Sequence, residues 1–185
     1  MCATTIGLAG PAGASTNIAS AARDDAADSR ADITEVIDTY SDGVAGVGVR
    51  VVSPEDPRTA YNWVNGFTFF VWTISTPAGA FDVVYHHFGS ELSAEVTKDS
   101  GATTVCNATP DFDGTTYTAV FAASCIGHPS SFQVRAFANY DDALAGGGGG
   151  LDFAPSLTEF CLHRDGDDHE FGYGSDHQPG WWHGG

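Results

Sequence analysis

Short runs of alternating apolar and polar residues constrain this chain most, because that alternation predicts half-buried β-strands. In the clearest run, from 45 to 51, every second residue is Ala or Val, and glycine or arginine fills the positions between. The same alternation recurs over 91–96, 116–121 and 131–136, and further β-branched or aromatic runs are 33–37, 67–74, 81–87 and 102–106. These runs predict about eight strands.

The spacing of these runs indicates the fold class. Before residue 140, no segment combines helical periodicity with helix-capping residues, and strand candidates follow one another at intervals of roughly ten to fifteen residues. This pattern predicts an all-β fold: an antiparallel β-sandwich, jelly-roll or immunoglobulin-like, with flexible N- and C-terminal tails. Phe67–Ile74 is apolar on both faces except for two threonines, which favours a central strand covered on both sides.

Composition divides the chain into five segments. Residues 1–14 are mostly small and end in Ala-Gly-Ala, which fits cleavage by signal peptidase. We therefore expect this segment to be the back half of a longer signal peptide. The alternative is a tail without a targeting role. Residues 15–31 have little to bury and are expected to be a disordered leader. The sandwich is expected over 32–142, a glycine linker over 143–150, and an acidic, histidine-rich tail over 151–185.

Charge excludes one class of partner. Lys and Arg number 7 against 24 Asp and Glu, which gives a net charge of −17 over 185 residues. Binding to nucleic acid requires a basic surface to meet the phosphates, so nucleic acid is not an expected partner. We also expect no membrane span, because no stretch approaches the roughly 18 apolar residues that a span needs.

The cysteines indicate an oxidising, extracellular location. Four occur, one of them within the expected signal peptide, and the favoured disulfide joins Cys106 to Cys125, which could add about 3 kcal/mol of stability. A simple hairpin turn over 110–114 would place Cys106 opposite about Ala119, so the bridge needs a bulge, a wide loop or another neighbouring strand. Pairing of either cysteine with Cys161 stays open, because spacing does not fix connectivity.

Four short motifs carry a resemblance to a known group of proteins. They are Asp32-Ile33 at the first strand, Cys125-Ile126-Gly127-His128-Pro129, the strand 132–136 that follows, and Asp152-Phe153-Ala154-Pro155. With them, the chain resembles secreted actinobacterial proteins of uncharacterised function, whose sandwich is similar to those of family 9 carbohydrate-binding modules and DOMON-type domains. The resemblance implies a non-catalytic extracellular sandwich with a face for a sugar or another small ligand, and it carries over no ligand residues. Trp72–Ser75 stands where relatives often have an Asp-rich strand end, which argues against a metal site there.

The C-terminal segment has the densest set of metal-ligand side chains: His163, Asp165, Asp167, His169 and His177. Imidazole and carboxylate together suit divalent transition metals, although no HExxH or EF-hand order is present. Three interpretations of this segment stay open: a solvated polar tail, weak metal binding, and an ordered metal site. We expect no resident cofactor beyond weak divalent metal binding in this tail.

Aromatic residues give the ligand-binding candidates Tyr61, Trp63 and Trp72, since exposed Trp and Tyr rings on a sandwich stack on sugar rings, and burial in the core is the competing interpretation. The sequence has no GxSxG nucleophile elbow, so we expect no enzyme. The sequence favours a secreted protein that binds a carbohydrate, a small molecule or an extracellular protein. The alternatives are a metal-dependent hydrolase using the C-terminal His/Asp cluster, and a surface-associated structural protein without a small ligand.

Overall fold

The computed structural model describes residues 15–20, 26, 28–41, 43–88, 91–98, 101–142, 149–154 and 161–164. The elements in chain order are β1 (Ser15–Ser20), β2 (Ile33–Ser41), β3 (Val44–Val51), α1 (Tyr61–Asn65), β4 (Phe69–Thr76), β5 (Gly79–Phe88), β6 (Glu91–Lys98), β7 (Thr103–Phe112), β8 (Thr116–Ala122), the 3-10 helix η1 (Ala123–Ile126), β9 (Ser131–Tyr140), β10 (Gly150–Ala154) and β11 (Cys161–Arg164). The predicted all-β antiparallel sandwich is confirmed, with eleven strands in the described part of the chain rather than about eight.

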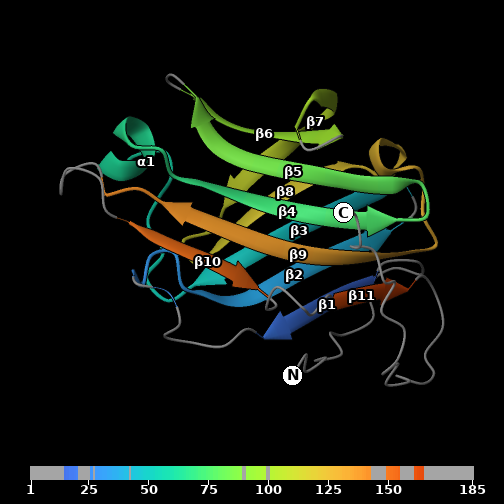
Figure 1. Ribbon diagram of the computed structural model, residues 1–185, viewed down its shortest axis with the longest axis horizontal. Coiled ribbons are helices and arrows are strands. Elements are labelled where there is room, and N and C mark those ends of the chain that lie inside the picture. The colour runs from blue at the N-terminus through green and yellow to red at the C-terminus, as the bar shows by residue number, and fades with distance from the viewer. Residues whose placement is uncertain are drawn as a thin grey trace, which may run out of the picture.

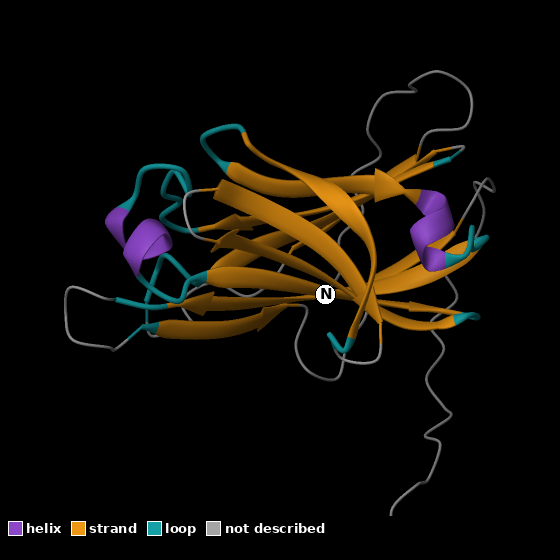
Figure 2. Cartoon of the chain, turned by 90° about the horizontal axis from the view of Figure 1, so that it is seen from above, coloured by secondary structure: helices purple, strands orange, loops and turns teal. Residues whose placement is uncertain are grey.

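The strands follow the order β1-β2-β3-β8-β7-β6-β5-β4-β9-β10, and β11 pairs with the first half of β9. The sheet folds over at β7, whose residues 103–108 pair with β6 while residues 109–112 pair with β8. One layer therefore contains β6, β5, β4, β9 and β10, and the other contains β8, β3, β2 and β1 (Figure 1). The short helices α1 and η1 lie at opposite ends of these layers (Figure 2).

Side-chain alternation fills the space between the layers. The inward positions of β4 are Phe70, Trp72 and Ile74, which are at most 2% exposed. The prediction for β4 is half right: the strand is central, between β5 and β9, but no described layer covers its outer face, where Phe69 and Val71 are half-buried. The second apolar face of this strand therefore lies on the surface of the sandwich.

Three strands lie in segments that the sequence predicts to be leader or tail. Residues 15–31 are expected to be disordered, yet Ser15–Ser20 forms β1 on the edge of β2. At the other end, β10 and β11 extend the sandwich beyond residue 142 along β9. Backbone pairing with an existing strand edge supplies the hydrogen bonds of these segments, so they need little apolar periodicity of their own. Residues 1–14 and 143–148 lie outside the described part of the chain.

Asp152 fixes the position of β10. Its Oδ2 accepts a hydrogen bond from the backbone N–H of Ile33 at 2.7 Å, and its Oδ1 accepts one from the N–H of Phe153 at 2.6 Å. The carboxylate is only 7% exposed, so these bonds form away from water, where they are strong. The late Asp-x-x-Pro motif thus begins with a structural residue that joins β10 to the start of β2.

The Asp-Gly turn between β7 and β8 is confirmed, but its register differs from the expected one. Thr109 pairs with Val120, so the register leads from Cys106 toward Ala123 rather than Ala119. β7 leaves β8 before Thr109, and η1 then brings Cys125 back to Cys106. The disulfide joins these two cysteines with a Cα–Cα separation of 6.0 Å, as predicted.

Asp113 closes this turn with its side chain. Its Oδ1 accepts hydrogen bonds of 2.8 Å from the N–H of Thr115, from the Thr115 hydroxyl and from the N–H of Thr116. These bonds stabilise the carboxylate and lower the pKa of Asp113 to about 2, and the bond from the Thr115 backbone N–H has the largest effect. The turn is therefore centred on Gly114 and Thr115, later in the chain than sequence spacing places it.

We expect a pH titration followed by NMR of the side-chain carboxyl carbon to give Asp113 a pKa of about 2. Because the folded pKa is below the value of about 3.9 for an unfolded chain, the stabilisation is complete above that value. It is lost as the pH falls through the folded pKa. An ordinary aspartate titration in the folded protein would contradict the turn geometry.

Neither helix in the described part of the chain has the length and apolar character needed to cross a lipid bilayer.

Candidate functional site

Two of the three predicted ligand-binding aromatics are core residues. Trp63 is 2% exposed and Trp72 is fully buried, so neither ring can stack on a ligand at the surface. The prediction of a binding role is wrong for both, because α1 turns Trp63 inward and Trp72 occupies an inward position of β4. Tyr61, on α1, remains accessible with 51% of its surface exposed.

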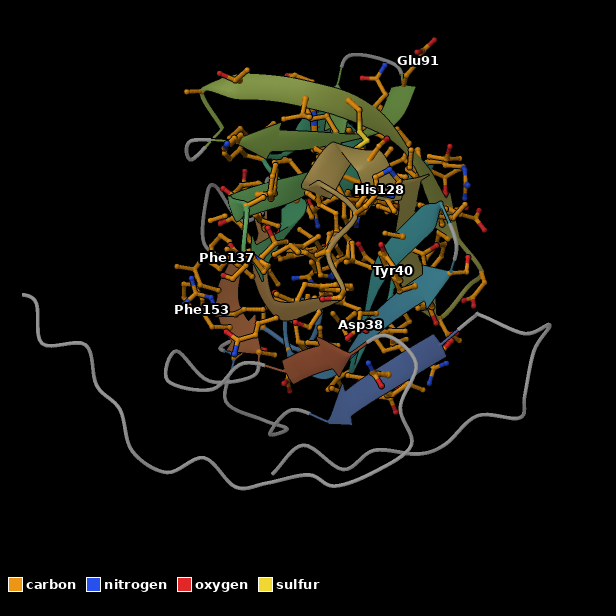
Figure 3. All side chains as sticks on the ribbon, turned by 90° about the vertical axis from the view of Figure 1, so that its right-hand side faces the viewer. Asp38, Tyr40, Glu91, His128, Phe137 and Phe153 are labelled. Atoms are coloured by element: carbon orange, nitrogen blue, oxygen red, sulfur yellow. A yellow bond between two sulfur atoms is a disulfide. The ribbon has the colours of Figure 1, made fainter. Side chains whose placement is uncertain are left out.

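A different set of apolar side chains reaches the surface, on the outside of β4, β9 and β10. We call it the aromatic face, and it consists of Phe67, Phe69, Phe137, Leu151 and Phe153. Phe67 is 73% exposed, Leu151 58% and Phe153 38%. Figure 3 shows Phe137 and Phe153 beside each other on the outside of β9 and β10. Isolated exposed apolar residues are normal, but a contiguous group of this kind is a candidate binding surface.

The rings of the aromatic face form a connected row. Ring centroids are 5.2 Å apart for Phe67 and Phe69, 5.9 Å for Phe69 and Phe137, and 4.6 Å for Phe137 and Phe153. Each of these distances lies within the range of favourable aromatic pairs. The row is therefore held by its own contacts and offers a preformed apolar surface.

Strand register explains why these side chains share one face. Phe137 pairs with Phe153 on β10 and with Val71 on β4, and directly paired residues in antiparallel strands point to the same side. Asn139, two residues further along β9, pairs with Leu151 and Phe69 and so adds a polar side chain to this face. The face thus combines aromatic, aliphatic and amide groups.

A hollow of about 410 Å³ opens at one end of the aromatic face. It is lined by Phe67, the segment 139–141, Gly149, Gly150 and Leu151. The N–H of Phe67 donates a hydrogen bond to Asp141 Oδ2 at 3.0 Å, and Asn139 Nδ2 donates to the carbonyl oxygen of Phe67. These bonds hold an exposed aromatic ring beside an amide and a carboxylate.

Behind the hollow, an ion-pair network anchors Tyr140. The guanidinium of Arg30 lies over the Tyr140 ring at 4.3 Å and pairs with Asp28 at 2.5 Å and Asp142 at 3.1 Å. The hydrogen bond to Asp28, followed by that to Asp142, raises the pKa of Arg30, while the bond to Arg30 lowers the pKa of Asp28. Burial, with the hydrogen bond to Glu55, raises the pKa of Tyr140 to about 12. Arg30 and Asp28 are therefore charged and Tyr140 is neutral at neutral pH, and the network supports the hollow structurally.

The outer face of the opposite layer differs in character. On β3 it has Gly46 and Gly48, with the side chains of Thr39 and Thr118 close to them, and on β8 it has Val120. Val120 is 43% exposed, similar to Phe153 on the aromatic face. It therefore provides a matched control position for mutagenesis.

The predicted C-terminal metal ligands lie outside the part of the chain in which side chains are described. His163 belongs to β11, whose backbone pairs it with Phe132, and Asp165, Asp167, His169 and His177 follow the last described residue. Within the described residues, no three His, Cys, Asp or Glu side chains gather as a metal site. The metal prediction for this tail stays a prediction.

The aromatic face could partly have been found from the sequence. The inward positions of β9 are Phe132, Val134 and Ala136. Side chains alternate along a strand, so Phe137, the next residue, is expected to point outward. The hollow could not have been found from the sequence, because it forms only when β10 pairs with β9 on the far side of the segment 143–148.

In comparisons with protein-family models, curated proteins and solved structures, no match to this chain is found.

Proposed function

We propose that this chain is a secreted, non-catalytic β-sandwich that binds a carbohydrate outside the cell through its aromatic face. The observation that carries the proposal is the connected row of exposed phenyl rings on β4, β9 and β10, next to a hollow with polar groups. A pyranose ring has an apolar C–H face and a rim of hydroxyls, so it matches a surface with aromatic rings and hydrogen-bonding groups at one end.

An extracellular setting is supported by the covalent chemistry. Cys106 and Cys125 are joined in a disulfide, and such bonds persist mainly in oxidising compartments. The small-residue N-terminus and the resemblance to secreted proteins point the same way. A non-catalytic role is supported by the absence of a GxSxG elbow from the sequence and by the apolar make-up of the aromatic face.

Binding of soluble polysaccharides and defined oligosaccharides, measured by affinity electrophoresis and calorimetry, tests the proposal. We expect the double variant Phe67→Ala/Phe153→Ala to lose about tenfold or more in affinity, which is about 1.4 kcal/mol, because it removes two of the rings that would contact the sugar. Both side chains lie on the surface, so the variant should fold, with a melting temperature lowered only by the loss of the ring contacts to Phe69 and Phe137.

Val120→Ala is the matched control, since it removes a similarly exposed apolar side chain from the opposite layer. Its affinity should equal that of the wild type. If no saccharide binds, or if the double variant binds as well as Val120→Ala, the proposed function is wrong.

A further inference from the structure

Asn139 and Asp141 both present oxygen acceptors to the hollow. Asn139 uses one N–H of its Nδ2 on the carbonyl oxygen of Phe67, which leaves its Oδ1 acceptor and its second amide N–H for a ligand. Asp141 accepts the N–H of Phe67 with Oδ2, and the described residues supply no donor for its Oδ1. A ligand that enters the hollow therefore meets oxygen acceptors from both side chains, and because the carboxylate accepts only, the atom of the ligand that faces Asp141 must be a donor.

The charge of Asp141 is not neutralised by a neighbouring cation within the described residues. Among the residues that line the hollow there is no Lys or Arg. Arg30, which lies over the ring of Tyr140, is already paired with Asp28 and Asp142. The hollow thus has one carboxylate whose counter-charge the ligand can supply, in a chain with a net charge of −17.

The apolar lining residues Phe67 and Leu151 could contact the apolar part of a cationic ligand. Phe67 is 73% exposed, so the face of its ring is available, and a cation over a phenyl face is attracted by the ring quadrupole. Leu151, 58% exposed, forms an apolar wall of the same hollow. A group that combines an apolar ring face with an ammonium would satisfy Phe67, Leu151 and Asp141 together.

We propose that the hollow binds a protonated amino sugar, so that the carbohydrate recognised by the aromatic face is a cationic oligosaccharide of glucosamine units. This inference rests on the proposed function and names its ligand class. The ammonium donates to Asp141 Oδ1, and the C–H face of the sugar contacts Phe67. Neutral sugars lack the charge that Asp141 would pair with, and anionic sugars are repelled by the carboxylate.

Calorimetry at mildly acidic pH, where the amine is protonated, tests the inference with three oligosaccharides of equal length. They are a glucosamine oligomer, its fully N-acetylated form, and a neutral glucose oligomer. We expect the wild type to bind the glucosamine oligomer about tenfold more tightly than the other two. Asp141→Asn should remove this preference, because asparagine can still accept the Phe67 N–H but has no charge.

The matched control is Glu95→Gln, which removes one negative charge from β6 in the same layer, three strands away from β9. It should keep the full preference for the glucosamine oligomer. An equal loss of preference in Glu95→Gln, or none in Asp141→Asn, would overturn the inference in favour of diffuse charge attraction. Melting temperatures of both variants should equal that of the wild type.

Two further outcomes separate this inference from the proposed function. Equal affinity for all three oligomers, lost in Phe67→Ala/Phe153→Ala, would overturn the amino-sugar inference and leave the aromatic face as a carbohydrate site. Absence of binding to any of them would overturn both. Butylammonium serves as a probe that represents a lysine side chain. If it binds as tightly as the glucosamine oligomer, and its affinity falls equally in Asp141→Asn, the site binds an amine without a sugar ring. The inference would then be wrong.

Discussion

Replacement of Trp63 by alanine is expected to lower the free energy of unfolding by about 4 kcal/mol. The indole is 2% exposed and contacts three other aromatic rings, with centroid distances of 5.5 Å to Phe70, 5.8 Å to Tyr85 and 5.4 Å to Tyr117. Its removal leaves a cavity that these rings cannot fill by small movements. Chemical denaturation followed by circular dichroism measures the loss.

Trp63→Phe keeps the experiment interpretable if the alanine variant does not fold. Phenylalanine retains most of the ring contacts, and it removes an indole N–H for which the described residues provide no acceptor. We therefore expect a loss of only about 1–2 kcal/mol. A wild-type stability for Trp63→Ala would contradict a core position for this side chain and would restore it as a surface candidate.

Loss of the disulfide is expected to be the second large effect. Cys125→Ser should lower the free energy of unfolding by about 3 kcal/mol under oxidising conditions, because the bridge closes a loop with a sequence separation of 19. Cys125 is 7% exposed, so the serine hydroxyl is also placed in an apolar environment. Thermal unfolding with and without reductant checks the prediction.

Cys106→Ser is the control for this effect. It breaks the same bridge from β7, where the cysteine is only partly buried, so it reports the loss of the cross-link with less disturbance of the core. Reductant should destabilise the wild type and have no such effect on either variant. A wild-type melting temperature that is unchanged by reductant would count against the bridge.

The fold class could be predicted because the alternation of apolar residues reflects burial on one side of each strand. In β9, for example, Phe132 and Val134 point inward and Gln133 points outward, as the sequence indicates. The strands β1, β10 and β11 could not be predicted, since their pairing depends on the free edges of β2 and β9. In those segments, tertiary context supplies what local pattern lacks.

The candidate site was harder to predict because exposure of an aromatic residue depends on which face of the fold is covered. Trp63 and Trp72 have the residue type that stacks on ligands, yet both point inward. Phe67 and Phe69 belong to a run that is expected to be covered on both sides, and their exposure follows from the lack of a described layer over the outer face of β4. Residue type alone therefore selects two buried side chains, Trp63 and Trp72, beside the outward-facing Phe67 and Phe69, while Tyr61 is exposed as predicted.

Whether the aromatic face binds carbohydrate can be tested by an NMR titration of the aromatic and methyl groups with an oligosaccharide that binds. We predict that shift changes gather on Phe67, Phe137, Leu151 and Phe153, while Val120 on the opposite layer stays unchanged. Changes centred on Val120 and its neighbours on β3 and β8, with the aromatic face unaffected, would contradict carbohydrate binding at this face.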